Sequence, residues 1–150
     1  MAVHKIDGGP GGQNDHFPKK FVTLYGTAAI TAGNWAMLDI TDTTNGLGAS
    51  VVTGVADDAA GDNGNLTFGI ATETTTAAGE VVIQIAGMYD GANVGASVAA
   101  GESLVMDNTS AGRVLTYAAG THTKATPCGI ALEDDTANAA AVMIINQGYF

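Results

Sequence analysis

The most constraining feature of this sequence is an internal repetition. GIATETTTAAGEVVIQIAG, which begins at Gly69, recurs at an offset of sixty residues as GIALEDDTANAAAVMIINQ, which begins at Gly129. A second match, at an offset of sixty-eight, aligns ITAGNWAMLD (30–39) with VAAGESLVMD (98–107). Two copies are too few for a solenoid, so we expect two similar halves that each bury an apolar face against the other. The matched positions are Gly69/Gly129, Ile70/Ile130, Ala71/Ala131, Glu73/Glu133, Thr76/Thr136, Ala77/Ala137, Val82/Val142, Ile85/Ile145 and Tyr89/Tyr149, and then Ala32/Ala100, Gly33/Gly101 and Asp39/Asp107.

Each half has the character of short strands joined by turns. From residue 21 onward, runs rich in Val, Ile, Thr and Tyr alternate with clusters of Gly, Asn and Asp. Glycine also interrupts the Ala-rich stretches, which disfavours helix there. The predicted fold is all-β, a small barrel or tulip-like structure with an internal pseudo-repeat, because closure removes exposed strand edges. The expected strands span 21–25, 35–40, 50–56, 66–72, 80–86, 103–107, 113–117, 127–133 and 140–146.

The alternation within EVVIQIA has the period of two that a pleated strand requires. Val81, Ile83 and Ile85 fall on one side of the strand, and Val82 and Gln84 fall on the other. At the offset of sixty, the positions that match Val81, Ile83 and Ile85 in the last strand are Ala141, Met143 and Ile145.

The first twenty residues differ from the rest of the chain. DGGPGGQNDHFPKK (7–20) contains two prolines and four glycines, which predicts an extended segment without regular structure. We therefore expect an extended N-terminal arm (1–20) followed by a single β domain (21–150). The two halves of that domain span about 21–88 and 89–150.

The charge distribution limits the possible partners. The formal net charge is −10, which argues against nucleic-acid binding, because phosphate neutralisation needs clustered Lys and Arg, and disfavours anionic membranes. Lys5, Lys19 and Lys20 lie in the arm, which leaves Arg113 and Lys124 as the cations of an acidic body. We expect no membrane association, because no apolar run reaches transmembrane length.

The compartment follows from two further observations. No export signal precedes the body, so we expect synthesis in a cytoplasm. The single cysteine, Cys128, excludes an internal disulfide framework and suits a reducing compartment.

Two motifs suggest ligand binding but have simpler interpretations. GGPGG (8–12) lacks the preceding strand, the following helix and the Gly-Lys-Ser/Thr of a phosphate loop. The acidic turn ADDAAGDNGN (56–65) carries oxygen ligands that suit calcium, but it lacks the spacing and closing Glu of the twelve-residue calcium loop. We favour a solvated turn and leave calcium open. EDD (133–135) is interpreted in the same way, because its counterpart in the first half is Glu73 followed by Thr.

The residues that could support catalysis also have structural interpretations. His122 and Cys128 raise the possibility of a thiol nucleophile beside a base. Cys128 aligns with Phe68, however, which predicts a small core residue. No spacing typical of a hydrolase or metalloenzyme occurs in the sequence, so we expect neither an enzyme nor a cofactor.

Aromatic residues are the main candidates for contacts between subunits. Core packing is the simpler interpretation for Trp35 and Tyr117. Tyr149 and Phe150 end the sequence and either fold back onto the body or dock against a neighbour. Because aromatic side chains often anchor interfaces, we assign Tyr89, Tyr149 and Phe150 to a hypothetical oligomer interface.

Several of these motifs together resemble the capsid decoration, or cement, proteins of tailed bacteriophages. They are the turn at Ala100, Gly101 and Glu102 before a strand ending in Asp107, the RVLTY strand, and the GIALEDD strand and turn that lead to the last strand. The first half repeats them as AGNWAMLD, GIATE and AAGEVVIQI. The likeness covers most of residues 21–150. The arm lies outside it, and the 56–65 loop departs from it.

This resemblance implies a virion protein on the outer surface of the capsid. It would bridge major capsid subunits after the shell expands, as a homotrimer in preference to a homodimer, without cofactor or reaction. The arm is the expected strap, with capsid contacts at Lys5, His16, Phe17, Lys19 and Lys20. The alternative is a tail-fibre or adhesin module that recognises host carbohydrate. Such a module needs a cluster of exposed aromatics, whereas Trp35 is solitary and lies in a predicted strand.

Overall fold

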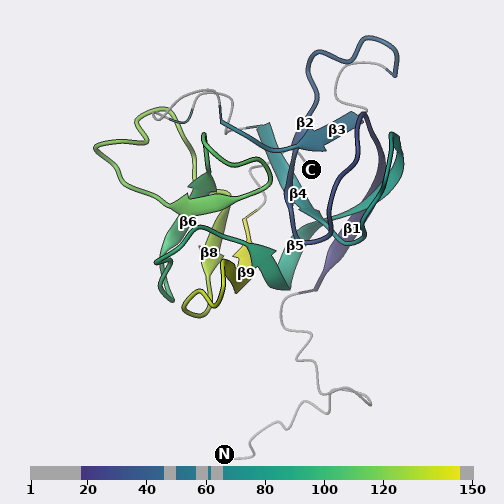
Figure 1. Cartoon of the computed structure of the whole chain (residues 1–150). Coiled ribbons are helices and arrows are strands. Elements are labelled where there is room, and N and C mark those ends of the chain that lie inside the picture. Colours follow the sequence, from purple (N-terminus) through teal and green to yellow (C-terminus); the bar gives the residue numbers. More distant parts are fainter. Residues whose placement is uncertain (1–17, 46–49, 57–60, 62–65, 146–150) are drawn as a thin grey trace, which may run out of the picture.

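The computed structural model describes residues 18–45, 50–56, 61 and 66–145, and its regular elements there are strands (Figure 1). Each strand expected from the sequence is present, so the all-β prediction is confirmed. The elements are β1 (Lys20–Gly26), β2 (Trp35–Leu38), β3 (Ser50–Thr53), β4 (Thr67–Ala71), β5 (Gly79–Asn93), β6 (Ser103–Met106), β7 (Val114–Thr116), β8 (Gly129–Ala131) and β9 (Ala139–Ile144).

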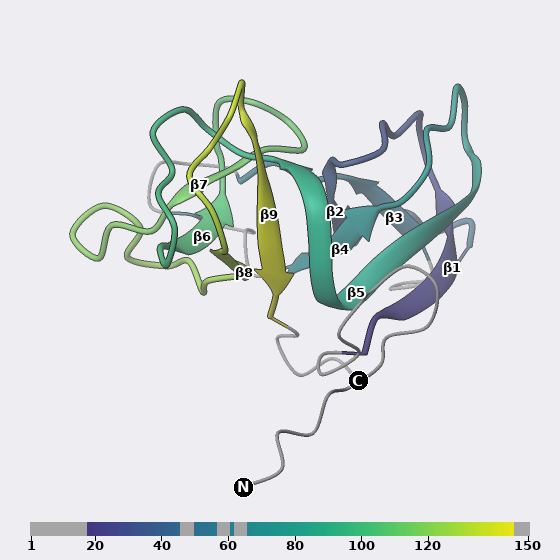
Figure 2. The same cartoon turned by 90° about the horizontal axis from the view of Figure 1, so that it is seen from below.

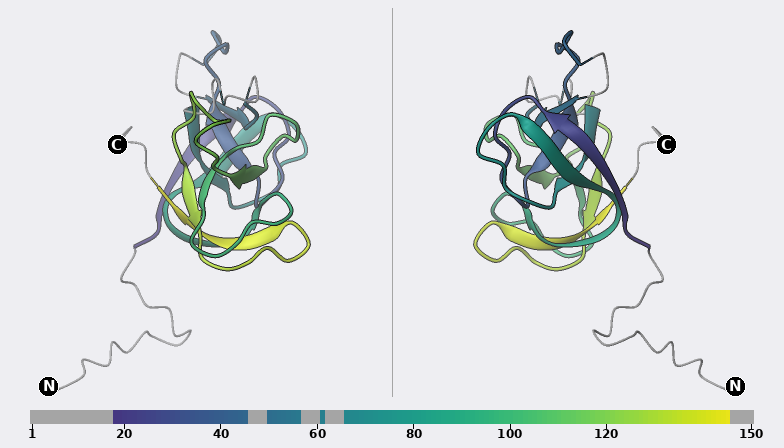
Figure 3. Two further views of the ribbon diagram at one scale, coloured as in Figure 1. Left: turned by 90° about the vertical axis from the view of Figure 1, so that its left-hand side faces the viewer. Right: turned by 90° about the vertical axis from the view of Figure 1, so that its right-hand side faces the viewer.

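The first half closes into a barrel, which we call the first barrel. Its strands follow the order β1-β3-β2-β4-β5, and β1 also pairs with β5. β1 runs parallel to β3, with Gly26 opposite Val51, and antiparallel to β5, with Thr23 opposite Val82. The right-hand view of Figure 3 shows β1 and β5 crossing one side of this barrel. Closure pairs strand edges that an open sheet would expose.

The second half repeats this arrangement, and we call it the second unit. The order β5-β9-β8-β6-β7 reproduces the order β1-β5-β4-β2-β3 of the first half, where β1 also pairs with β5. A parallel bridge between Val94 and Val114 takes the place of the β1–β3 pair. Equivalent hydrogen bonds accompany it, from Thr27 N to Val51 O at 3.0 Å and from Gly95 N to Val114 O at 2.7 Å. The end of β5 therefore has the role in the second unit that β1 has in the first barrel.

β5 connects the two halves and bends sharply between them (Figure 2). Its first part pairs with β4 and β1, and its second part pairs with β9. At the bend, Gly87 has φ = +88°, a conformation that glycine adopts readily. The buried Gln84 amide donates to Ala86 O at 3.1 Å and Met88 O at 2.9 Å. The predicted boundary between the halves, at 88/89, thus falls inside one strand.

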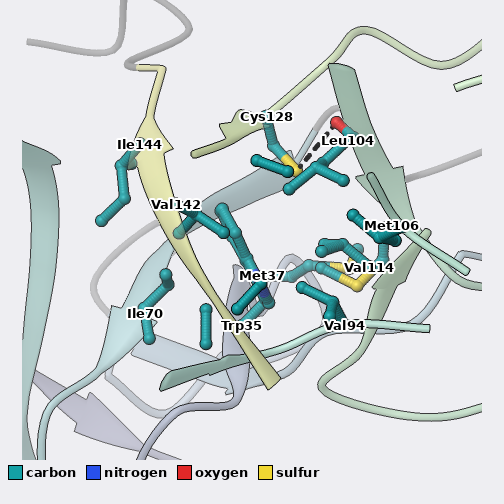
Figure 4. Close-up of a cluster of buried hydrophobic side chains, with 14 of the residues drawn as sticks. Trp35, Met37, Ile70, Val94, Leu104, Met106, Val114, Cys128, Val142 and Ile144 are labelled. Carbon is teal, nitrogen blue, oxygen red and sulfur yellow. Dashed lines mark hydrogen bonds between the residues drawn. The ribbon is translucent and has the colours of Figure 1, made fainter. Parts of the chain in front are cut away.

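Two apolar clusters fill the two halves. The cluster of the first barrel contains Ile30, Ala36, Val51, Phe68, Ala71, Val81, Ile83 and Ile85. The cluster of the second unit includes Leu104, Val114, Cys128 and Val142, and also Trp35, Met37 and Ile70 from strands of the first barrel (Figure 4). Residues of β2 and β4 therefore bury side chains against the second unit, which joins the halves through apolar contacts.

The residues of β9 that match the buried Val81, Ile83 and Ile85 of β5 do not face the core. The buried side chains are Ala140, Val142 and Ile144 rather than Ala141, Met143 and Ile145. Ile83 of β5 lies opposite Ala71, but Val142 of β9 lies opposite Ala131, which is one residue closer in sequence. Because side chains alternate along a strand, this slip exchanges the two faces.

A tight hairpin explains the slip. Ala137 and Asn138 both have positive φ, 53° and 64°, as in a two-residue type I′ turn. Thr136 and Ala139 on either side exchange N–H···O bonds of 2.8 and 3.1 Å. This turn sets the register between β8 and β9.

Candidate interaction surface

The beginning of β1 presents cationic and aromatic side chains to solvent. Lys19 and Lys20 are exposed, and they are followed by Phe21, which is 54% exposed. Along β1, Phe21, Thr23 and Tyr25 point outward, while Val22 and Leu24 pack against the core of the first barrel. Lys5, His16 and Phe17, the other predicted capsid contacts, lie outside the described residues.

The predicted interface residue Tyr89 makes its recorded contacts within the chain. Its ring is half-buried against the core of the second unit, and its hydroxyl donates to Ala71 O at 3.2 Å. Burial raises the pKa of this hydroxyl. These contacts join the end of β5 to β4, and the interface role stays a prediction. Tyr149 and Phe150 lie outside the described residues.

The matched aspartates Asp39 and Asp107 each close the turn after a strand. Each Oδ1 accepts hydrogen bonds from the N–H and the hydroxyl of the threonine two residues later, Thr41 or Thr109, at 2.7–2.9 Å. The pKa of Asp39 is lowered, chiefly by the hydroxyl of Thr41.

Asp107 is fully buried and also accepts from Arg113 Nε at 2.6 Å. Burial alone would raise the pKa of Asp107, but the hydrogen bonds from Thr109 and Arg113 together lower it. The positive charge of Arg113 therefore compensates the negative charge of the buried Asp107 carboxylate.

Cys128 is a core residue, as the sequence predicted. Its side chain is buried, and Sγ lies 3.4 Å from Leu104 O (Figure 4). Burial raises the pKa of the thiol to about 12, so the thiolate is disfavoured at neutral pH. The recorded contacts of His122 are local: Nδ1 accepts from Ala118 N at 2.8 Å, and the ring lies 5.9 Å from that of Tyr117.

The acidic turn after β8 binds backbone amides. Glu133 Oε1 accepts from Ala141 N at 2.8 Å, and Asp134 Oδ1 accepts from Ala100 N at 2.9 Å. Within the described residues, no group of three or more His, Cys, Asp or Glu side chains is placed to hold a metal ion. Most of the acidic 56–65 turn lies outside those residues.

The structure also reveals a surface that sequence reasoning missed. Met143 and Ile145, which match the buried Ile83 and Ile85 in sequence, point outward beside Met88 on the neighbouring strand. The Ala137-Asn138 turn was the available signal, because a two-residue hairpin fixes which side chains of β9 face inward.

None of the known protein-family models matches the chain, and no curated protein matches it in sequence. No helix in the described part of the chain has the length and apolar character needed to span a membrane.

Proposed function

We propose that this protein is a capsid decoration protein that binds the outer surface of an expanded icosahedral phage head and stabilises contacts between major capsid subunits. The observation that carries the proposal is the exposed group formed by Lys19, Lys20, Phe21 and Tyr25, which extends from the residue before β1 to near its end. It follows the N-terminal segment in a chain whose formal net charge is −10. Cationic and aromatic side chains together suit an acidic protein surface with apolar pockets.

The segment before β1 supplies the rest of the proposed contact. Residues 1–17 carry Lys5, His16 and Phe17, and a segment that orders on binding can follow a groove across more than one capsid subunit. A protein that binds only the assembled shell stabilises it by about 2.7 kcal/mol per site at a hundredfold excess over Kd. An oligomer adds avidity, and the resemblance to decoration proteins favours a homotrimer over a homodimer.

The alternative, a carbohydrate-binding module, has less support from the described surface. Sugar recognition would use a cluster of exposed aromatics beside amide and carboxylate groups. Trp35 is completely buried, and the exposed Phe21 follows two exposed lysines instead of such groups. A glycan array compared with capsid binding separates the two functions.

Removal of residues 1–17 tests the proposed strap. The truncation keeps β1 and its pairing with β5, so we expect a folded protein with wild-type circular dichroism. We expect it to lose co-sedimentation with expanded empty heads built from the major capsid protein of the same phage. Wild-type loading by the truncated protein would exclude the strap, and failure of the full chain to load would exclude the capsid role.

A matched pair of substitutions tests the exposed group itself. Phe21→Ser removes its most exposed aromatic side chain, and Ile40→Ser removes a similarly exposed apolar side chain, 51% exposed, after β2. We expect loading to fall for Phe21→Ser alone. An equal loss in both variants would show that general surface apolarity, rather than this group, drives binding.

A further inference from the structure

The second unit has an apolar outer face in addition to its apolar core. Met88 on β5 lies opposite Met143 on β9, which lies opposite Ile130 on β8, so the three side chains form one row across the strands. Met88, Leu132 and Ile145 are 42%, 39% and 38% exposed. We define the outer apolar face by six residues: Ala86, Met88, Ile130, Leu132, Met143 and Ile145.

An outer sheet face of this composition requires an explanation. A sheet with one solvated face normally alternates apolar and polar residues, but the outward positions of β8 and β9 carry no polar side chain: they are Ile130, Ala139, Ala141 and Met143. Contiguous exposed apolar side chains on a soluble protein indicate a binding surface. β5 and β9 lie side by side on this part of the molecule in Figure 2.

Opposite charges lie at two ends of the outer apolar face. Lys20 on β1 pairs with Ala86 at one end, and the exposed Glu133 and Asp134 follow Leu132 at the other. The strand order β1-β5-β9-β8 separates these ends by three inter-strand spacings, or about 14 Å. Lys20 pairs with Ala86, which precedes Met88 on β5. The N–H of Leu132 donates to the carbonyl of Ala141, which lies on the other side of the Met88–Met143 pair. The charges therefore occupy diagonally opposite corners.

From this arrangement we propose that the outer apolar face binds the same face of a second copy of the chain. The two-fold axis lies in the plane of the face and passes between Met88 and Met143, at right angles to the line that joins the two charged corners. It places Lys20 of each copy near Glu133 and Asp134 of the other. Met88 and Met143 then meet their counterparts at the centre. Such an interface is self-complementary, as two-fold symmetry requires.

The chemistry of the face favours a second copy over an unrelated partner. Its uncharged centre needs an apolar counterpart, and each charged corner needs a corner of opposite sign, which the same face provides. The net charge of −10 per copy opposes association only weakly at physiological salt, because exposed charges more than about 8 Å apart are screened. The proposal does not depend on the capsid role. It departs from the homotrimer implied by the resemblance. It takes Lys20 from the proposed capsid contacts and leaves Lys19, Phe21 and residues 1–17 for them.

Sedimentation equilibrium of the full chain tests the proposal. We expect a dimer for the wild type and a monomer for Met88→Lys at the same concentration, with Kd raised at least a hundredfold, because two lysines would be buried at the centre. Ile40→Lys makes the same charge change at an exposed apolar residue outside the face, and it should remain dimeric. A wild-type monomer or trimer, or a dimer that persists in Met88→Lys, would overturn the proposal.

Charge reversal tests the pairing at the corners. Lys20→Glu and Glu133→Lys should each weaken the dimer about tenfold, because each change occurs twice in a symmetric pair. The double variant should recover most of the affinity. The double variant and the single Glu133→Lys variant both lack the Glu133–Ala141 hydrogen bond. A higher affinity of the double variant therefore reports the new ion pairs. Glu80→Lys, at an exposed position opposite Tyr25 on the first barrel, controls for net charge. Absence of recovery would overturn the two-fold arrangement.

Discussion

At the scale of single residues, the two halves use one aspartate in two environments. Asp39 and Asp107 both bind the N–H and hydroxyl of a threonine two residues later. Asp39 is partly exposed and accepts a further bond from Thr27, whereas Asp107 is fully buried and relies on Arg113. The sequence match identified the pair, but the difference in burial depends on tertiary packing that a local motif does not contain.

We predict that Asp107→Asn destabilises the protein more than Asp39→Asn does. The Asp107→Asn change would leave Arg113 without its carboxylate and would weaken the hydrogen bonds from Thr109, which should cost about 1–3 kcal/mol. The Asp39→Asn change would keep an acceptor for the threonine partners in a partly solvated turn. Urea unfolding of both variants at pH 7 measures the difference, and equal losses would show that the buried ion pair adds nothing.

The pH dependence of stability should report the same carboxylate. A carboxyl group whose pKa is lower in the folded state contributes stability above its unfolded pKa, near 4, and loses it as the pH falls through the folded value. The pKa of Asp107 is lowered, so the wild type should lose stability below about pH 4. The pKa of Asp39 is lowered as well, so urea unfolding at pH 7 and at pH 3 should show a smaller acid loss in Asp107→Asn, and also in Asp39→Asn, than in the wild type.

At the scale of strands, the positions of the strands were predictable from the sequence, but the facing of β9 and the length of β5 were not. Each expected strand is present because runs of β-branched residues between glycine and aspartate clusters are a local signal. The outward direction of Met143 and Ile145 does not follow from their match to Ile83 and Ile85, because β9 is apolar on both faces and alternation alone does not choose between them. The extension of β5 to Asn93 was missed because Asp90 and Gly91 interrupt its apolar pattern at a bulge.

The repeated Gly-Ile-Ala motif has a steric cause at this scale. A Cβ on Gly69 would clash with Gln84 O and would lie 2.8 Å from Ile83 Cγ2, which shows how closely β4 approaches β5. A Cβ on Gly129 would lie 2.9 Å from the Trp35 ring and 3.1 Å from Met143 O. The motif recurs because the strands β4 and β8 each pass too close to a neighbour for a larger residue.

We predict that Gly69→Ala lowers the free energy of unfolding by about 1–3 kcal/mol, the usual cost of overpacking a core. The backbone oxygen of Gln84 belongs to the bent strand β5 and cannot move without disturbing its pairing. Gly79→Ala is the matched control, because a Cβ there meets nothing within 4 Å, and its stability should equal or exceed that of the wild type. Similar losses in both variants, measured by urea unfolding, would refute the steric explanation.

At the scale of the whole molecule, the two similar halves are not independent domains. β5 belongs to both, and Trp35, Met37 and Ile70 of the first barrel are buried in the cluster of the second unit. Backbone hydrogen bonds also join the halves, from Trp35 N to Gly112 O at 3.0 Å and from Ala56 N to Asp107 O at 3.0 Å. The repetition predicted two halves but not their joint core, because the contacts between the copies do not repeat.

We therefore predict that the chain unfolds in a single cooperative transition. Trp35 is the only tryptophan and reports the contact between the halves, so its fluorescence and the far-ultraviolet circular dichroism should change at the same urea concentration. Leu104→Ala, in the core of the second unit, should cost about 2–5 kcal/mol. It should also accelerate exchange of the slowest amide hydrogens of β1 and β3 in the first barrel, because both halves share one global opening. If those amides kept wild-type protection while the second unit opened, the halves would be separate folding units and β5 would be only a covalent link between them.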